Sequence, residues 1–158
     1  LKRRTPQNIV IGGAAGAFPP MVGWAAVTGG VSLDSVLLFL IIFFWTPPHS
    51  WALALLVNTD YARAGVPMMP VARGEATTRR QIVIYTVALL VVSVLPFFTD
   101  TLSVLYLFAS IALGGGLLWW SIELLKRKDG ATAKRTYKYS TAYLAFLFLA
   151  MILDRVIL

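Results

Sequence analysis

Residues 34–57 read DSVLLFLIIFFWTPPHSWALALLV, and this run is the strongest structural signal in the chain. After the opening aspartate, it contains one ionisable residue, His49, among apolar and small polar side chains. A helix needs about 20 mainly apolar residues to cross the hydrocarbon core of a bilayer. The run therefore predicts a transmembrane helix with a single histidine near the middle of the membrane.

Four further apolar runs of similar length occur in the 158-residue chain, at 8–28, 81–98, 102–125 and 139–158. Hydrophobic residues make up 58% of the sequence and charged residues 13%, about half of the charged share of a soluble domain. The mean hydropathy is +0.76. No run alternates between faces as a membrane barrel would require. These features exclude a water-soluble or disordered chain and predict one all-α domain, a polytopic transmembrane helix bundle with five spans.

The basic residues predict how this bundle is oriented. All of the 14 lysines and arginines except Arg155 lie before 8–28, in 58–80 or in 126–138, which share one side of the membrane if every run crosses it. Connections rich in Lys and Arg stay in the cytoplasm. We therefore expect loops 58–80 and 126–138 to be cytoplasmic. The net charge of +7 is then a topology signal, and we expect no nucleic-acid partner.

Three helix-disrupting motifs fall at one depth. Pro19-Pro20, Pro47-Pro48 and Gly114–Gly116 each lie 10 to 12 residues from a cytoplasmic boundary, which is roughly 15–18 Å along a helix. A broken helix survives inside a bilayer only where protein or a cavity satisfies its backbone. The motifs predict interrupted helices around an internal cavity. The alternative is that Pro and Gly are simply common in membrane helices.

His49 is a candidate functional residue because an ionisable group at mid-membrane must be compensated for its desolvation. If its helix continued to residue 60, His49 and Asp60 would lie eleven residues apart and close to one face. We therefore expect a pocket that reaches from Asp60 to His49. The alternative is a histidine that bonds a neighbouring carbonyl for packing.

The segment after residues 34–57 carries candidate chemistry. Asp60 and Arg63 are three residues apart, and so they can point at one ligand from a helical turn. Carboxylate and amide oxygens bind Mg²⁺, and the guanidinium fork binds phosphate. The pair would suit a diphosphate head whose apolar tail lies in the membrane. The alternative is a surface ion pair, which is the more frequent role of a single Asp–Arg pair.

Three motifs carry a resemblance to a known family: KRRTPQNIVIGG at 2–13, FWTPPHSW at 44–51 and DYARAGVPMMP at 60–70. Together they resemble the haem farnesyltransferases, or haem O synthases, a branch of the intramembrane (UbiA-type) prenyltransferases. The resemblance implies a nine-helix bundle of which this chain holds the last five helices. It also implies Mg²⁺-dependent transfer of a farnesyl group from farnesyl diphosphate to a vinyl group of haem B, giving haem O and diphosphate.

The resemblance further assigns site residues. It implies that Asp60 and Asn58 hold Mg²⁺ with the diphosphate, that Arg63 and Arg73 contact diphosphate oxygens, and that His49 serves the haem pocket as an iron ligand or a polar contact. The remaining substrate-binding candidates are Tyr61, Lys2, Arg3 and Arg4.

Two features depart from the family pattern. The first Asp-rich motif of these enzymes is absent, and the second is reduced to Asp60 beside Asn58. We therefore expect the chain alone to be inactive and to need the N-terminal half of the same protein as a partner.

The implied location is a bacterial inner membrane, where haem A synthase or oxidase assembly factors are possible partners. The alternatives are a prenyltransferase for a quinone precursor, and a small transporter or membrane scaffold without enzymatic activity.

Overall fold

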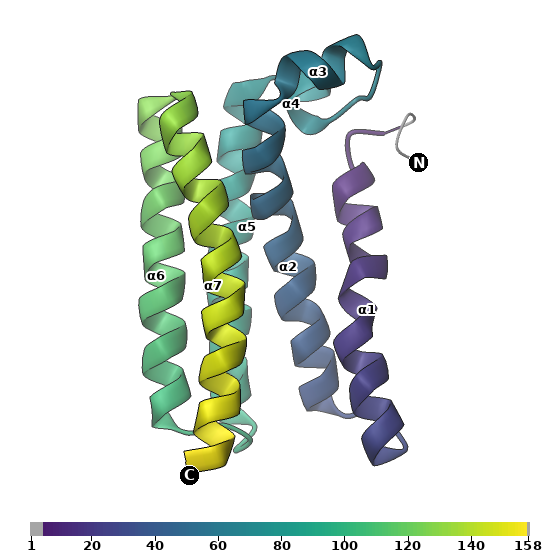
Figure 1. Cartoon of the computed structure of the whole chain (residues 1–158), viewed down its shortest axis with the longest axis vertical. Helices are drawn as coiled ribbons and strands as arrows, with labels where there is room; N and C mark the ends of the chain where they lie inside the picture. The colour runs from purple at the N-terminus through teal and green to yellow at the C-terminus, as the bar shows by residue number, and fades with distance from the viewer. Residues whose placement is uncertain (1–4, 158) are drawn as a thin grey trace.

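The computed structural model describes residues 5–157, and all of its regular structure is helical. Five long helices form an elongated bundle (Figure 1): α1 (Asn8–Thr28), α2 (Leu33–Leu56), α5 (Glu75–Phe98), α6 (Val104–Arg127) and α7 (Gly130–Ile157). Each is long and apolar enough to cross a membrane. Two short helices, α3 (Asn58–Arg63) and α4 (Met69–Arg73), lie across one end of the bundle. The expected all-α transmembrane fold is confirmed.

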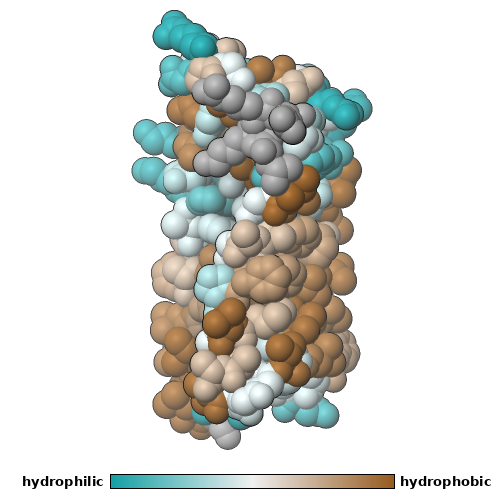
Figure 2. Space-filling view, turned by 90° about the vertical axis from the view of Figure 1, so that its right-hand side faces the viewer, coloured by the Kyte–Doolittle hydropathy of each residue, from teal (hydrophilic) through white to brown (hydrophobic). Residues whose placement is uncertain are grey.

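Helix α2 is the centre of the arrangement. It packs against α1, α5 and α7, whereas α6 packs against α5 and α7. Among the elements described, α1 contacts α2 alone. Figure 2 looks onto the α1 side and shows hydrophobic residues along most of the length of the bundle, with hydrophilic residues gathered at the α3–α4 end. The polar connection between α2 and α5 therefore covers one end of an apolar bundle.

The predicted helix interruptions are wrong. Helices α1 and α2 continue through Pro19-Pro20 and Pro47-Pro48, and α6 continues through its glycine triplet. The glycines serve close packing instead: a Cβ on Gly114 would overlap the side chain of Leu90, and a Cβ on Gly116 would overlap the hydroxyl of Tyr139. Small residues allow membrane helices to approach in this way.

Two helices begin earlier than their apolar runs. Helix α5 starts at Glu75 rather than at 81, and α7 starts at Gly130 rather than at 139, because polar first turns continue the helix beyond the apolar segment. Asp129 caps α7, and its Oδ1 accepts a hydrogen bond from the Thr132 amide at 2.6 Å. This bond holds the pKa of the Asp129 carboxyl below its ordinary value.

Candidate functional site

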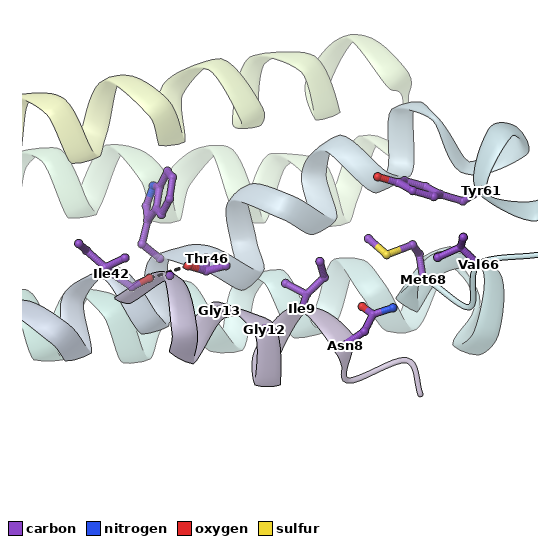
Figure 3. Close-up of a pocket in the computed structure, with 11 residues that line it drawn as sticks. Asn8, Ile9, Gly12, Gly13, Ile42, Thr46, Tyr61, Val66 and Met68 are labelled. Carbon is purple, nitrogen blue, oxygen red and sulfur yellow. Dashed lines mark hydrogen bonds between the residues drawn. The ribbon is translucent and has the colours of Figure 1, made fainter. Parts of the chain in front are cut away.

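A pocket of about 620 Å³ lies between α1, α2 and the segment that contains α3 and α4 (Figure 3). It extends along α1 from Asn8 to Gly16, and Ile42, Trp45 and Thr46 of α2 form its facing wall. Tyr61, Val66 and Met68 line it at the α3–α4 end. The result is an elongated, largely apolar hollow that extends to the polar end of the bundle.

Glycines in α1 determine the shape of this pocket. At Gly13 an added Cβ would lie 3.0 Å from Thr46 Cγ2, so the two helices touch there. At Gly12 and Gly16, an added Cβ would meet nothing within 4 Å. The side facing α2 is therefore closely packed at Gly13, while the neighbouring glycines leave open volume.

Of the predicted site residues, Tyr61 is the one that lines the pocket. It lies in α3 and is half-buried. Its carbonyl accepts a hydrogen bond from Val66 N at 3.0 Å, and this bond closes a turn through Gly65, whose φ is +63°. A residue with a Cβ would be strained at that φ, so this glycine helps to bring Val66 back beside Tyr61.

Asp60 and Arg63 lie in α3 on either side of Tyr61, at the α3–α4 end of the pocket, but do not line the pocket. Both side chains are exposed. The ion pairs found within residues 5–157 are Arg79–Glu75 and Arg127–Glu123, so Asp60 and Arg63 do not pair with each other. Arg73 is also exposed, at the last residue of α4. The segment therefore presents one carboxylate and two guanidinium groups that are open to a ligand.

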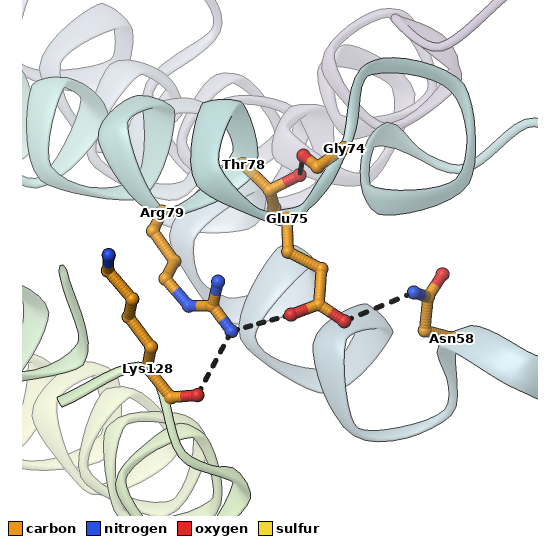
Figure 4. Close-up of polar contacts among 6 residues, drawn as sticks. All are labelled: Asn58, Gly74, Glu75, Thr78, Arg79 and Lys128. Atoms are coloured by element: carbon orange, nitrogen blue, oxygen red, sulfur yellow. Dashed lines mark hydrogen bonds and ion pairs between the residues drawn. The ribbon is translucent and has the colours of Figure 1, made fainter.

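Asn58 belongs to a different polar network (Figure 4). Its Nδ2 donates to Glu75 Oε1 at 3.3 Å, and Arg79 Nη2 donates to Glu75 Oε2 at 2.7 Å and to the carbonyl of Lys128 at 3.4 Å. Arg79 is 8% exposed. The network ties α3 to α5 and to the α6–α7 turn, and so it fixes the helix that carries Asp60.

Sequence reasoning missed this network. Glu75 and Arg79 are four residues apart, a spacing that pairs opposite charges on one helix face and could have revealed the ion pair. The contact with Asn58 could not be read from spacing, because it joins two helices. Asn58 Oδ1 and Arg79 Nε remain buried without a partner in the described part of the chain.

The expectation that His49 and Asp60 share one helix face is wrong. Helix α2 ends at Leu56, and Val57 leaves helical geometry with φ −115° and ψ 28°, so the chain turns before α3. His49 faces α7 instead, where its Nδ1 lies 2.8 Å from Ser140 Oγ. Its ring lies 4.3 Å from that of Trp45, which lines the pocket. Lys2, Arg3 and Arg4 lie outside the described residues.

The donor set for a metal ion is small. No group of three or more His, Asp or Glu side chains that could hold a metal occurs within residues 5–157. Near the pocket, Asp60 offers an exposed carboxylate and Asn58 offers an amide oxygen without a hydrogen-bond partner. These are oxygen ligands of the kind that Mg²⁺ prefers, and Mg²⁺ commonly completes its shell with water and substrate phosphates. The residues fit a shared metal site rather than a closed protein cage.

The chain is similar in sequence to named proteins. Proteins named "Protoheme IX farnesyltransferase" from Parvibaculum lavamentivorans and Aromatoleum aromaticum are 54% and 55% identical to 99% and 98% of the chain, and the aligned part is 51% of each relative. One from Roseiflexus castenholzii is 55% identical over 99% of the chain and 29% of its own length. The chain thus spans about half, or less, of the curated relatives it matches.

A solved structure shares the fold. It was reported as "Structural and mechanistic insights into the biosynthesis of Digeranylgeranylglyceryl phosphate synthase in membranes", and it matches 97% of this chain and 54% of its own with a TM-score of 0.86 at 19% identity. The UbiA prenyltransferase family model matches residues 1–152. The chain belongs to the UbiA prenyltransferase family.

Proposed function

We propose that this chain is the C-terminal part of a haem farnesyltransferase, which transfers a farnesyl group from farnesyl diphosphate to a vinyl group of haem B. The observation that carries the proposal is the apolar pocket beside α3, where Asp60 and Arg63 are exposed and unpaired with each other. The apolar pocket could hold an isoprenoid tail, and the charged side chains at its α3–α4 end could bind a diphosphate. The names of relatives at about 54% identity support haem as the acceptor.

Farnesyl transfer requires that the charged segment containing α3 and α4 neutralise the diphosphate as it leaves. The allylic C–O bond breaks, and its electron pair leaves with the diphosphate, whose charge Arg63 and Arg73 stabilise with forked hydrogen bonds. The vinyl π electrons then form the new C–C bond, and water quenches the remaining cation with release of a proton. Asp60, with Asn58, would hold Mg²⁺, which neutralises further charge on the diphosphate when it is bound.

The open face of α1 supports a larger bundle. Among the described elements α1 contacts only α2, and Ile11, Phe18 and Val22 are 48%, 49% and 63% exposed. The chain covers about half, or less, of the length of the matched relatives. We infer that the remainder of the protein packs beside α1 and supplies further metal ligands. In this arrangement α3 and the α6–α7 turn face the cytoplasm of a bacterial inner membrane.

The test uses the full-length protein that contains this chain, in lipid nanodiscs with farnesyl diphosphate, haem B and Mg²⁺. We expect diphosphate release together with a farnesylated porphyrin in the mass spectrum, and loss of both on chelation of Mg²⁺. Release with a phenolic acid but not with haem would instead identify a quinone-precursor enzyme. No release with either acceptor would favour a transporter or scaffold and overturn the proposal.

Arg63 provides the matched variant. Arg63→Ala should reduce turnover by about 10²-fold, because it removes a group that stabilises the leaving charge. Arg80→Ala removes an exposed arginine of α5 outside the pocket and should leave turnover near that of the unmodified protein. Equal turnover in the two variants would exclude Arg63 from diphosphate binding.

A further inference from the structure

A second pocket, of about 400 Å³, lies at the end of the bundle away from α3. It is lined by the ends of α1, α2, α5 and α7 and by the connection between α5 and α6. Helices α1 and α7 do not contact each other, and α2 lies between them in Figure 1. The pocket occupies the space that they leave beside α2, and we call it the far-end groove. Its volume lies within the range of about 300–1,000 Å³ that ligand pockets have.

Helix α7 supplies the long wall of this groove. Its lining residues are spaced by three or four positions, so they form one stripe on the helix: Phe148, Met151, Ile152, Arg155 and Val156. Arg155 lies in the last turn of α7, and Phe148 lies seven residues earlier, which is about 10 Å along the helix axis. The groove therefore runs from a charged rim at the helix end into an apolar interior within the membrane.

The rim holds two opposite charges that do not pair with each other. Asp34 and Arg155 both line the groove, and neither forms an ion pair within residues 5–157. Asp34 Oδ1 accepts the hydroxyls of Thr99 and Thr101, but no hydrogen bond to Oδ2 occurs in the described chain, and Oδ2 is not among the buried atoms that lack a partner. Arg155 is exposed, and its Nη1 donates to the Thr101 carbonyl at 3.2 Å. One carboxylate oxygen and most of one guanidinium thus remain accessible at the rim.

The charge balance around the rim indicates what kind of ligand fits. The charged side chains at this end of the described chain are those of Asp34, Asp100, Asp154 and Arg155. A purely anionic group could bind the guanidinium but would lie among an excess of carboxylates. A ligand that carries a phosphate and an ammonium group together would complement both signs of charge.

We propose that the far-end groove binds a phospholipid with an ethanolamine headgroup. Arg155 binds the phosphate with its guanidinium fork, and Asp34 Oδ2 accepts a hydrogen bond from the ammonium group. An acyl chain lies along the apolar stripe of α7 and against Leu38, one turn deeper in α2 than Asp34. The primary ammonium has three N–H donors for the carboxylate, whereas the trimethylammonium group of choline has none.

Trp24 supports a lipid as the occupant of this groove. It lines the groove from α1, and no hydrogen bond from its indole N–H occurs in the described part of the chain. Tryptophan is enriched at the membrane–water interface, where its N–H can donate to the ester carbonyls of lipids. The groove lies at the opposite end of the bundle from Asp60, so this inference goes beyond farnesyl transfer and does not depend on it.

The experiment is native mass spectrometry of the full-length protein in detergent, with equal amounts of phosphatidylethanolamine, phosphatidylcholine and phosphatidylglycerol that carry identical acyl chains. We expect the ethanolamine lipid to be retained about tenfold more than either of the others, because it alone satisfies both charges with hydrogen bonds. Equal retention of the three lipids would overturn the proposal. Retention of none would also overturn it, and would show that another part of the protein fills the groove.

Two variants separate the headgroup contacts. Arg155→Gln should lower the retention of all three lipids by about tenfold, because each carries a phosphate. Asp34→Asn keeps an acceptor for Thr99 and Thr101, and it should lower the retention of the ethanolamine lipid to that of the choline lipid. Asp100→Asn is the matched control, since Asp100 is an exposed carboxylate at the same end that does not line the groove. The same lipid retention in Asp34→Asn and Asp100→Asn would overturn the assignment of the ammonium group.

A second pair of variants tests the place of the acyl chain. Ile152→Trp puts a large side chain into the groove and should lower lipid retention, whereas Leu153→Trp alters the neighbouring residue, which does not line the groove. Ile152 and Leu153 are 59% and 43% exposed, so both variants should fold, and melting temperatures in detergent check this. Unchanged retention in a folded Ile152→Trp variant would show that the lipid does not bind in the far-end groove.

Discussion

Two carboxylates at opposite ends of the bundle, those of Asp154 and Asp60, have opposite surroundings. At the end away from α3, Asp154 is 2% exposed, and it accepts hydrogen bonds from the Ser103 amide, the Ser103 hydroxyl and the Tyr106 amide. At the α3 end, Asp60 is exposed, and no hydrogen bond or ion pair to its carboxylate occurs within residues 5–157. A carboxylate whose oxygens accept several hydrogen bonds from protein stabilises the fold, whereas a carboxylate without such bonds remains available to a ligand.

Asp34 extends the contrast. It lies in the first turn of α2, at the same end as Asp154, and its Oδ1 accepts hydrogen bonds from the hydroxyls of Thr99 and Thr101 at 2.9 and 2.7 Å. These bonds join α2 to the α5–α6 connection. Asp34 and Asp154 at the far end therefore tie helices together, whereas the carboxylate of Asp60 at the α3 end is not bound by the described part of the protein.

The largest effect should come from Asp60. Asp60→Asn in the full-length protein should reduce turnover by about 10²–10³-fold, because the Mg²⁺ that would neutralise the leaving diphosphate loses its carboxylate ligand. Thermal unfolding should change little, since Asp60 is exposed. Asp34→Asn is the matched variant at the far end, and it should keep most of the activity. Similar turnover in both variants would remove the functional distinction between the two ends.

Asp154 should show the complementary behaviour. Asp154→Ala should destabilise the protein by about 2–4 kcal/mol, because it leaves buried donors at the start of α6 without an acceptor. The melting temperature in detergent, measured by tryptophan fluorescence, reports this change. Asp154→Asn keeps an acceptor oxygen, and so its melting temperature should fall less than that of Asp154→Ala. A wild-type melting temperature in Asp154→Ala would show that the hydrogen bonds at this end do not stabilise the fold.

Gly12 tests the pocket itself. Gly12→Leu should raise KM for farnesyl diphosphate by about tenfold, the equivalent of one to two buried CH₂ groups, because the new side chain occupies the open volume. Gly23→Leu is the control, since Gly23 also has nothing within 4 Å of an added Cβ but does not line the pocket. The same KM in both variants would place the tail elsewhere.

The smallest effect should come from Asp129, an exposed residue that caps α7 at the α3 end. Its hydrogen bond with Thr132 lowers its folded pKa, so the carboxylate stabilises the protein above the unfolded pKa and loses this effect as the pH falls through the folded pKa. The melting temperature of Asp129→Ala should therefore be slightly lower than that of the wild type at neutral pH. The difference between the two melting temperatures should disappear below about pH 4.

Asp129→Ser is the appropriate control for that pH dependence. Its hydroxyl can still accept the Thr132 amide, but it does not titrate in this range. We expect its melting temperature to differ from that of Asp129→Ala by an amount that does not vary with pH. A gap between wild type and Asp129→Ala that persists at low pH would show that charge is not the source of the stabilisation.

Hydropathy was sufficient to predict the five long helices and the absence of a strand pattern, because burial in lipid demands apolar runs of a set length. It could not give the polar first turns of α5 and α7, which continue the helix outside the apolar runs. The proline pairs were misinterpreted because a helix can absorb them without ending. Sequence does not show which neighbours compensate the missing amide.

The candidate site was predictable only in part. The short spacing of Asp60 and Arg63 correctly placed them on one turn of helix. The longer spacing from His49 to Asp60 failed, because a single non-helical residue, Val57, redirects the chain. The contacts of His49 with Ser140 and of Asn58 with Glu75 join residues far apart in sequence, and no periodicity encodes them.

Trp45 contacts both the pocket beside α1 and the packing of α2 against α7. One indole lines the hollow beside α1, stacks on the imidazole and is anchored to the backbone of α7. An occupant of the pocket that displaced this indole would therefore also disturb its stacking on His49 and its hydrogen bond to the backbone of α7.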